Sequence, residues 1–293
     1  MQSTASEATA PAAKIEVPYL LLTHIPYCVD ERGRICLGGA WKRDLERHFE
    51  YLGRMVLVAP QHDSLPEEPD LVPLVVPDGV EFRVSPLPRQ DTSGRALLAL
   101  PKTFLTLWRE IRRASVVHSG IVGWPYPLGW IANPLALLFK RPLVILVESA
   151  HWRLSGDGPY SWRQRLRAAV TEKLARFFVR RADLTIFTQP SYRDSMLGEG
   201  ARSRGEIIPA SWIDESDIRA SEDAEVDWQR KRAEMESRPR LLFAGRLTRE
   251  KGIPVLLEAI QILDERGVRV RVDVIGEGPL REACEEVAAD LEH

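Results

Sequence analysis

The sequence predicts an α/β protein whose helices cover a parallel, Rossmann-like sheet on both faces, followed by a second, smaller unit of the same kind. Short apolar runs, typical of buried strands, alternate with longer segments in which apolar residues recur at helical spacing. Such alternation is typical of βαβ units and therefore of a parallel sheet. The length of 293 residues exceeds one typical domain and fits two.

The composition is that of a globular protein, with 44% hydrophobic and 28% charged residues. A formal net charge of -2 gives no electrostatic reason to expect a nucleic-acid partner. The three cysteines, Cys28, Cys36 and Cys284, lack the spacing and the histidine neighbours of a zinc site. An odd, sparse set of cysteines is typical of reduced thiols, so we predict a cytoplasmic protein.

Two segments bear on targeting and membrane insertion. Residues 1–16 are rich in Ala, Ser, Thr and Glu and contain no apolar core, so we expect a disordered tail and no secretory signal. The segment 115–139 lacks charged residues but contains three prolines and three glycines. This density of helix breakers disfavours a membrane-spanning helix, and we expect a buried strand at 116–118 and a buried helix at 127–140.

The first unit begins with a strand at 17–23, after which a long loop at 25–37 leads to Gly38, Gly39 and a helix at 40–52. A glycine pair at a helix start lets a ligand approach the backbone N–H groups and the positive end of the helix dipole. A tight turn is the alternative explanation for the pair. Further strands are expected at 55–59, 80–84, 143–148, 184–188 and 206–209, and further helices at 97–112 and 161–181.

Polar side chains follow two neighbouring strands, at the carboxyl ends where ligands bind in such sheets. His118 ends one strand, and Glu148 ends the next, with His151 three residues later. A carboxylate at the end of an apolar strand is costly without a partner, and His151 could be that partner. We therefore predict His118, Glu148 and His151 as catalytic residues. The alternative for His118 is a buried histidine bonded to the backbone.

The helix expected at 161–181 is basic and amphipathic. Its apolar stripe consists of Leu166, Val170, Leu174 and Phe177, and the cations that flank it, beside Trp162, are Arg165, Lys173, Arg176 and Arg180. One interpretation is contact with anionic lipids, which would place the protein at the inner face of a membrane. The alternative is a helix that faces the core and has a solvated basic side.

The second unit opens with a strand, a loop and a helix. The apolar run 240–244 ends at Gly245, and Arg246 and Lys251 follow in the loop before a helix that starts near Pro254. Free N–H groups and the helix dipole on one side, with two cations on the other, would hold a phosphate. The alternative is that Arg246 and Lys251 are solvated loop charges.

The motif Phe-x-Gly-Arg-Leu-x-x-Glu-Lys-Gly at 243–252, with Val-Ile-Gly-Glu-Gly-Pro-Leu at 274–280, resembles the start of the donor-binding domain of glycosyltransferase family 4. The resemblance implies the GT-B fold, with two facing Rossmann-like domains, and a nucleotide-sugar donor. It implies that Arg246 and Lys251 bind the donor diphosphate, close to Gly245, Gly38 and Gly39. It also implies that no metal or other cofactor is needed.

The reaction implied by the resemblance is transfer of a sugar, with retention of configuration, from a nucleotide diphosphate to a hydroxyl of a glycan, a glycolipid or a small molecule. The sequence departs from the family at its acceptor side. Family members often carry His-x-His after the strand that ends at His118, and a histidine at the end of the next strand. Here His118 corresponds to the first histidine of the pair, and Gly120 occupies the position of the second. Glu148 occupies the end of the next strand.

These observations divide the chain into a tail at 1–16, an acceptor-side domain at 17–214, a linker at 215–238 and a partial donor domain at 239–293. The Glu-x7-Glu segment of the family, which would follow, is absent, so we expect a truncated donor domain and a chain that is inactive alone. One alternative is a non-catalytic fragment that binds a membrane surface or a protein partner. A sugar-nucleotide epimerase is another, and the motif disfavours it.

Overall fold

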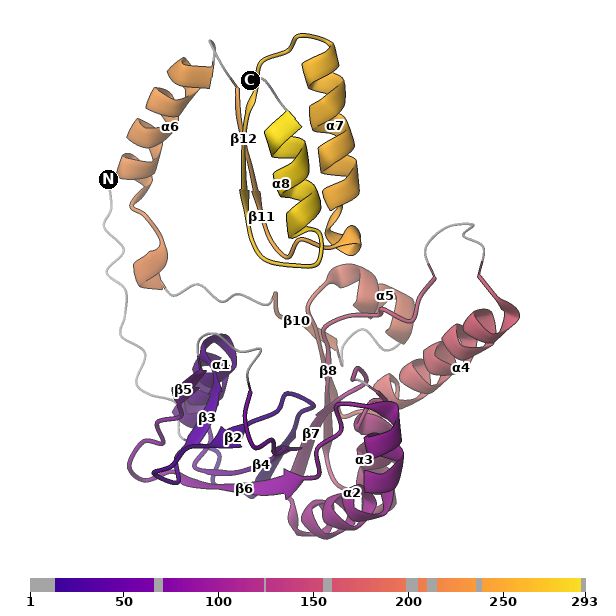
Figure 1. Cartoon of the computed structure of the whole chain (residues 1–293). Coiled ribbons are helices and arrows are strands. Elements are labelled where there is room, and N and C mark those ends of the chain that lie inside the picture. Colours follow the sequence, from indigo (N-terminus) through magenta and orange to yellow (C-terminus); the bar gives the residue numbers. More distant parts are fainter. Residues whose placement is uncertain are drawn as a thin grey trace. The chain divides into compact units, whose positions relative to one another are not determined.

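The computed structural model describes residues 14–65, 71–123, 125–154, 160–198, 205–209, 215–235 and 239–290. The chain divides into two compact units, Met1–Trp212 (unit 1) and Ile213–His293 (unit 2), which are shown in Figure 1. Most of the predicted tail and the segment 210–214, which contains the predicted domain boundary, lie outside the described residues.

Unit 1 is built on a parallel sheet with the strand order β10-β9-β8-β7-β1-β4-β6. The bounds are β1 (Tyr19–Leu22), β4 (Arg54–Pro60), β6 (Glu81–Leu87), β7 (Val116–Gly120), β8 (Leu143–Val147), β9 (Leu184–Phe187) and β10 (Gly205–Ile207). All neighbouring strands in this sheet run parallel. This arrangement confirms the predicted α/β fold, and it explains why the strands read as continuous apolar runs.

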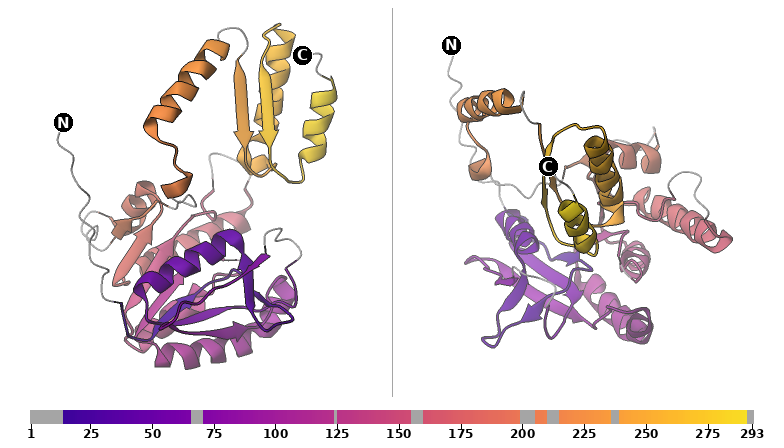
Figure 2. Two further views of the ribbon diagram at one scale, coloured as in Figure 1. Left: turned by 90° about the vertical axis from the view of Figure 1, so that its left-hand side faces the viewer. Right: turned by 45° about the horizontal axis from the view of Figure 1, so that its top comes forward.

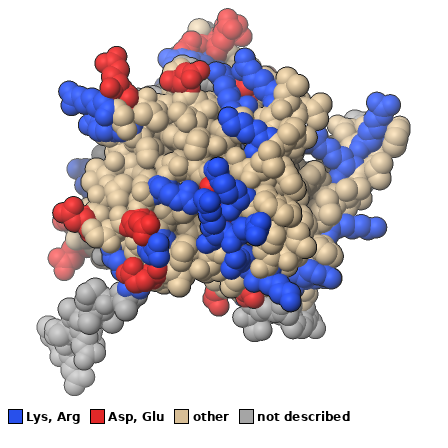
Figure 3. All heavy atoms as spheres, turned by 90° about the horizontal axis from the view of Figure 1, so that it is seen from below, with Lys and Arg blue, Asp and Glu red and all other residues tan. Residues whose placement is uncertain are grey.

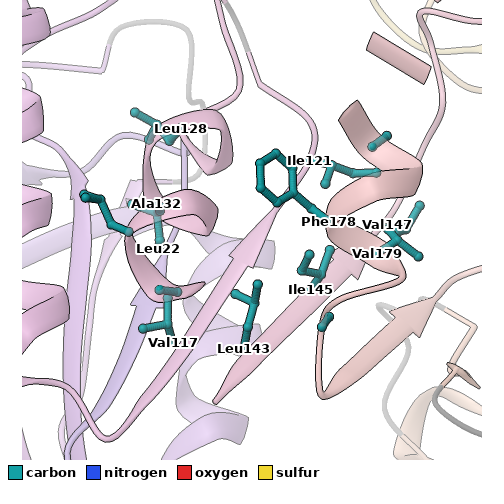
Figure 4. Close-up of a cluster of buried hydrophobic side chains, with 14 of the residues drawn as sticks. Leu22, Val117, Ile121, Leu128, Ala132, Leu143, Ile145, Val147, Phe178 and Val179 are labelled. Atoms are coloured by element: carbon teal, nitrogen blue, oxygen red, sulfur yellow. The ribbon is translucent and has the colours of Figure 1, made fainter. Parts of the chain in front are cut away.

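Helices cover both faces of the sheet (Figures 1 and 2). On one face, α1 (Gly39–Tyr51) buries Leu45 and Phe49 against alternate side chains of β1 and β4. On the other face, one core cluster joins α2 (Ser93–Arg113), α3 (Gly129–Leu138), α4 (Trp162–Val179) and α5 (Pro190–Leu197) to the remaining strand side chains. Figure 4 shows part of that core, where Ala132 and Phe178 lie with Val117, Leu143 and Ile145.

The prediction of a long loop at 25–37 was wrong. This segment contains β2 (Cys28–Val29) and β3 (Ile35–Gly38), which form a small antiparallel sheet with β5 (Leu71–Pro73). The turn between β2 and β3 is made by Asp30, whose carboxylate accepts hydrogen bonds from the backbone N–H groups of Arg32 and Arg34 at 3.0 and 2.8 Å. Strands this short carry too little apolar periodicity to be recognised in a sequence.

The core-facing alternative for 161–181 holds only in the C-terminal half of the helix, where Leu174 of the predicted stripe packs against the core, whereas Leu166, Val170 and Phe177 face solvent. Leu166 is 55% exposed and Val170 is 46% exposed, whereas the helix packs on the core through Thr171, Ala175, Phe178 and Val179. The helix begins at a capping box in which the side chains of Ser161 and Gln164 each bond the other's backbone N–H. No helix of the described residues is long and apolar enough to cross a bilayer.

Unit 2 contains η2 (Glu215–Asp217), α6 (Ser221–Met235), β11 (Arg240–Ala244), η3 (Arg249–Lys251), α7 (Ile253–Glu265), β12 (Arg271–Ile275) and α8 (Arg281–Asp290). The predicted linker therefore includes a helix, α6. Strands β11 and β12 pair in parallel from Arg240 opposite Arg271 to Ala244 opposite Ile275, which is the arrangement expected of a βαβ unit.

Glu172 on α4 ties the loop after β8 to the helix. Its carboxylate accepts hydrogen bonds from the Trp152 indole at 2.8 Å, from Arg153 at 2.8 and 3.0 Å and from Arg176 at 2.8 Å. Arg153 also donates to the Ser195 hydroxyl of α5 at 2.9 Å. Burial opposes ionisation, but these bonds and the adjacent charges outweigh it and lower the pKa of Glu172 to about 2.

Replacing Glu172 with Gln should lower the free energy of unfolding by about 1–3 kcal/mol near pH 7, because Arg153 and Arg176 lose a charged acceptor. Since the folded pKa of Glu172 is depressed, its stabilisation is complete above the ordinary glutamate pKa of about 4.3 and is lost as the pH falls toward about 2. Urea unfolding of both proteins from neutral to acidic pH measures this difference.

The matched control is Glu50→Gln, which removes the exposed pair with Arg47 and should change the stability by less than about 0.5 kcal/mol. Equal effects of the two substitutions, or a deficit of the Glu172→Gln variant that grows as the pH falls, would contradict this assignment.

Candidate functional site

The connection from β11 to α7 is a compact loop held by its backbone. Gly245 follows the strand, and Leu247 is buried, so the loop is anchored between its two cations. The turn η3 ends at Gly252, which has φ 83 and ψ 14 and starts α7 from this left-handed conformation. A side chain at this position would be strained, which explains the glycine of the motif.

Two glycines let the loop after β12 lie against this connection. A β-carbon at Gly276 would overlap the carbonyl oxygen of Gly245, and one at Gly278 would overlap the backbone of Leu247. Because the two loops lie this close, the Leu247 N–H donates to the Glu277 carbonyl at 2.8 Å, and the Leu280 N–H donates to the Leu247 carbonyl at 3.1 Å. The position of the segment 245–251 is therefore fixed without using its charged side chains.

Arg246 and Lys251 are both exposed, and among the described side chains neither takes part in an ion pair. The helix α7 that follows has Pro254 in its first turn and no side-chain cap. Its first N–H groups and the positive end of its dipole are therefore open to an anion. The loop thus presents two cations and an uncapped helix start within one short segment.

In unit 1, Gly38 and Gly39 stand at the start of α1, as predicted. Gly38 is the N-cap with φ −59 and ψ 143, a conformation that other residues also adopt. The first turn of α1 has no side-chain cap and no acidic residue. This helix start has the same chemical character as that of α7, so an anion could approach it as well.

The structure places His118 in the core, beneath α1. Its Nδ1 lies 3.0 Å from the Tyr19 hydroxyl, its ring centroid lies 6.2 Å from that of His48, and its Nε2 has no partner among the described residues. Burial, assisted by the charge of His48, lowers the pKa of His118 to about 3. The imidazole is therefore neutral and shielded from solvent, and its partner is a tyrosine and not the backbone group considered in the alternative.

Glu148 and His151 follow β8 at the carboxyl edge of the sheet but do not pair with each other. Partial desolvation of the Glu148 carboxyl, followed by the negative charge of Asp44, raises its pKa. His151 is exposed and packs edge-on against the Trp152 ring, with 5.7 Å between the centroids. Glu148 therefore keeps a carboxylate of raised basicity without the predicted histidine partner.

Asp44 and His48 on α1 were not predicted as site residues. They lie one helical turn apart, with His48 Nδ1 bonded to the Asp44 carbonyl at 2.8 Å and 3.8 Å from its carboxylate. The signal that could have identified them is the i, i+4 spacing of an acid and a histidine on the helix that follows the glycine pair.

A surface cavity of about 250 Å³ opens at the opposite edge of the sheet, near the starts of β1, β4 and β6. Its charged lining includes Arg54, Arg83 and Glu110. The Glu110 carboxylate is buried and bonded to Arg83 at 2.5 Å, to Arg109 at 3.1 Å and to Ser85 at 3.3 Å. This cavity is lined by a completed ion-pair cluster and lies at the end of the sheet where parallel folds do not usually bind ligands.

Comparisons with known proteins show the family of the chain. Residues 43–210 match the family model described as a glycosyl transferase 4-like domain, and residues 225–293 match the model of glycosyl transferases group 1. An alpha-D-kanosaminyltransferase of Streptomyces kanamyceticus is 27% identical over 153 residues, which cover 50% of this chain and 38% of that protein. The chain thus spans well under half the length of this curated relative.

Two solved structures are similar in part. A UDP-N-acetylglucosamine 2-epimerase from Rickettsia bellii aligns with a TM-score of 0.40 and 11% identity, over 94% of this chain and 66% of that chain. A ugt transferase from Siraitia grosvenorii in complex with UDP aligns with a TM-score of 0.42 and 12% identity, over 89% and 74% of the two chains. The family relationship is shown by the two sequence models.

The burial of His118 predicts that its imidazole does not take up a proton between about pH 8 and about pH 5. The depressed folded pKa also means that the neutral form stabilises the fold above the ordinary histidine pKa of about 6.5, and that this stabilisation is lost as the pH falls toward about 3. NMR of ring-labelled histidine measures the protonation directly. The same resonance in denaturant should titrate near pH 6.5, and a folded-state midpoint between about 5 and 8 would contradict the burial.

Proposed function

Since the chain belongs to the glycosyl transferase 4-like family, we propose that it transfers a sugar from a nucleotide-diphosphate sugar to a hydroxyl group. The observation that carries this proposal is the β11–α7 loop, which presents Arg246 and Lys251 beside an uncapped helix start. The proposal includes a nucleotide-diphosphate sugar as the donor, a hydroxyl as the acceptor and retention of configuration at the transferred sugar.

The proposed chemistry follows from the charge that develops when a glycosidic bond to a diphosphate breaks. The leaving diphosphate gains negative charge, and groups that are already in place stabilise this charge without reorganisation. Arg246 would donate from its planar guanidinium to two phosphate oxygens, whereas Lys251 would act as a point charge. The N–H groups at the start of α7 would supply further donors. This site needs no metal ion to neutralise the diphosphate.

In unit 1 we propose that Glu148, with its raised pKa, accepts a hydrogen bond from the acceptor hydroxyl, and that the exposed His151 assists in binding the acceptor. Gly38 and Gly39 leave the backbone N–H groups at the start of α1 accessible to an anionic ligand. The buried His118 is better suited to positioning Tyr19 and α1 than to contact with a substrate. Glycans, glycolipids and small molecules all carry suitable hydroxyls.

The proposal predicts that UDP binds at the β11–α7 loop of the 293-residue chain. Because the described part of unit 2 offers phosphate contacts from one loop, we expect affinity no tighter than about millimolar and no turnover by this chain alone. Replacing Arg246 or Lys251 with Ala should weaken binding by about tenfold each, the effect of one charge-assisted hydrogen bond. Amide chemical shifts followed during titration with UDP measure both the affinity and the location.

The matched control is Arg266→Ala, which removes an exposed cation at the other end of the same helix and should leave the affinity unchanged. Unchanged binding in both the Arg246 and Lys251 variants would refute the assignment. Micromolar binding would show that other residues hold most of the nucleotide.

We also propose that the 161–181 segment contacts a membrane surface at its cytoplasmic face. Trp162 is 69% exposed and Phe177 is 44% exposed, and the Arg181 guanidinium lies 3.8 Å from the Phe177 ring centroid. The one acid of α4, Glu172, is already bonded to Arg153 and Arg176, so the outer side of this helix is cationic. Apolar side chains beside cations are the combination that binds anionic lipids.

For this segment we predict co-sedimentation with vesicles that contain an anionic lipid, weakening as the salt concentration rises. Replacing Arg163, Arg165 and Arg167 with Glu should abolish the contribution of α4 to vesicle binding. It leaves the residues that bond to Glu172 unchanged. The control is the same number of charge reversals on α6, at the exposed cations Arg230, Lys231 and Arg232. Equal vesicle binding by both triple variants would exclude 161–181 as the contact.

A further inference from the structure

The helix α2 carries an apolar stripe on its outer side that the core does not use. Leu97, Leu98 and Leu105 are 67%, 84% and 65% exposed, and Phe104 is 42% exposed. The spacing of these residues places them along one side of the helix, next to its buried side, which consists of Ala96, Ala99, Thr103, Leu107, Glu110 and Ile111. Leu138, at the end of the neighbouring α3, is 63% exposed and extends the patch.

This patch, the α2–α3 face, is flanked by cations, and the described acids next to it, Glu110 and Asp91, are bonded to arginine. The acid of α2, Glu110, is buried and bonded to Arg83 and Arg109. Within its bounds α2 has five cations, Arg95, Lys102, Arg109, Arg112 and Arg113, and α3 has no charged residue. Lys140 and Arg141 follow α3 directly, and the Arg112 guanidinium lies 6.0 Å from the Phe139 ring centroid.

The charge distribution is uneven for a chain of formal net charge -2. The helices α2, α3 and α4 pack on the same face of the sheet, and together they contain ten Lys and Arg residues and two acids, Glu110 and Glu172, both of which are bonded to arginine. Figure 3 shows unit 1 from below, on the side where Figure 1 places α2, with Lys and Arg side chains across the middle of the view. This face therefore attracts anionic surfaces.

We propose that the α2–α3 face binds an anionic lipid bilayer, with Leu97, Leu98 and Leu105 entering the boundary between headgroups and acyl chains. A helix that lies in the plane of the interface needs an apolar side that enters the bilayer and cations at the level of the lipid phosphates. The α2–α3 face supplies both, and Lys102 lies at the flank of the leucine stripe, between Leu98 and Leu105 along the helix. This contact goes beyond the proposed sugar transfer, because it requires neither a donor nor turnover, and it adds α2 and α3 to the membrane contact proposed for α4, which packs on the same face of the sheet.

A second copy of the chain or a nucleic acid would fit the α2–α3 face less well than an anionic lipid surface does. A second copy of the same face would bring like charges together, which disfavours a symmetric dimer through this surface. A nucleic acid would use the cations but would leave three exposed leucines in contact with a phosphate backbone that they cannot bind. Anionic lipid is the partner that uses the cations and the leucines together.

The test is vesicle co-sedimentation of the 293-residue chain, with vesicles of phosphatidylcholine alone or mixed with phosphatidylglycerol. We expect binding to the mixed vesicles and little binding to the neutral ones. The combined change Leu97→Ser, Leu98→Ser and Leu105→Ser should weaken the binding at least about tenfold, because it removes the apolar area that enters the bilayer. Lys102→Glu should weaken it less and should reduce its dependence on salt.

The matched control is Val226→Ser on α6, a side chain that is 70% exposed in unit 2 and should leave vesicle binding unchanged. Circular dichroism and thermal unfolding of each variant show whether it is folded, which is expected because all the substituted side chains are exposed. Wild-type binding by the triple leucine variant would overturn the proposal, as would equal binding to neutral vesicles. Binding to RNA that is equally strong and insensitive to the leucine changes would identify a general anion surface and would also overturn it.

Discussion

The close contact between the loops after β11 and β12 is the constraint on which the proposed donor site depends. Gly276 and Gly278 permit this contact because they have no side chain to collide with the backbone of Gly245 and Leu247. Backbone hydrogen bonds then hold the loop, and Leu247 is buried beneath it. Because the loop does not need its cations for its own stability, they remain available to bind a diphosphate.

In unit 1 the parallel sheet determines where polar side chains can lie. A parallel sheet covered on both faces must be apolar along its strands, so polar side chains gather where the strands end. Glu148 is at such an end, and the loop that carries it is held to α4 by Arg153 and Glu172. The cost of partly burying Arg153 and Glu172 is offset by their hydrogen bonds, and Glu172 also holds the Trp152 indole against which His151 packs.

The sequence predicted the α/β class, most strands of the main sheet and the strand–loop–helix around Arg246, because long apolar periodicity and a complete motif are local signals. It missed the β2–β3 hairpin, since that depends on the side-chain bonds of Asp30. It could not show that the outer stripe of α4 faces solvent or that His118 bonds to Tyr19, a residue 99 positions away. Contacts between distant residues leave no periodic pattern, and only the fold reveals them.

In the proposed donor complex, Arg246, Lys251 and the start of α7 hold the diphosphate. A crystal structure of the chain soaked with UDP at a concentration well above the expected dissociation constant tests this arrangement most directly. We expect phosphate oxygens within about 3 Å of the Arg246 guanidinium, the Lys251 ammonium and the first N–H groups of α7. A diphosphate bound elsewhere, for instance between Arg54 and Arg83 at the opposite edge of the unit 1 sheet, with the β11–α7 loop left empty, would contradict it.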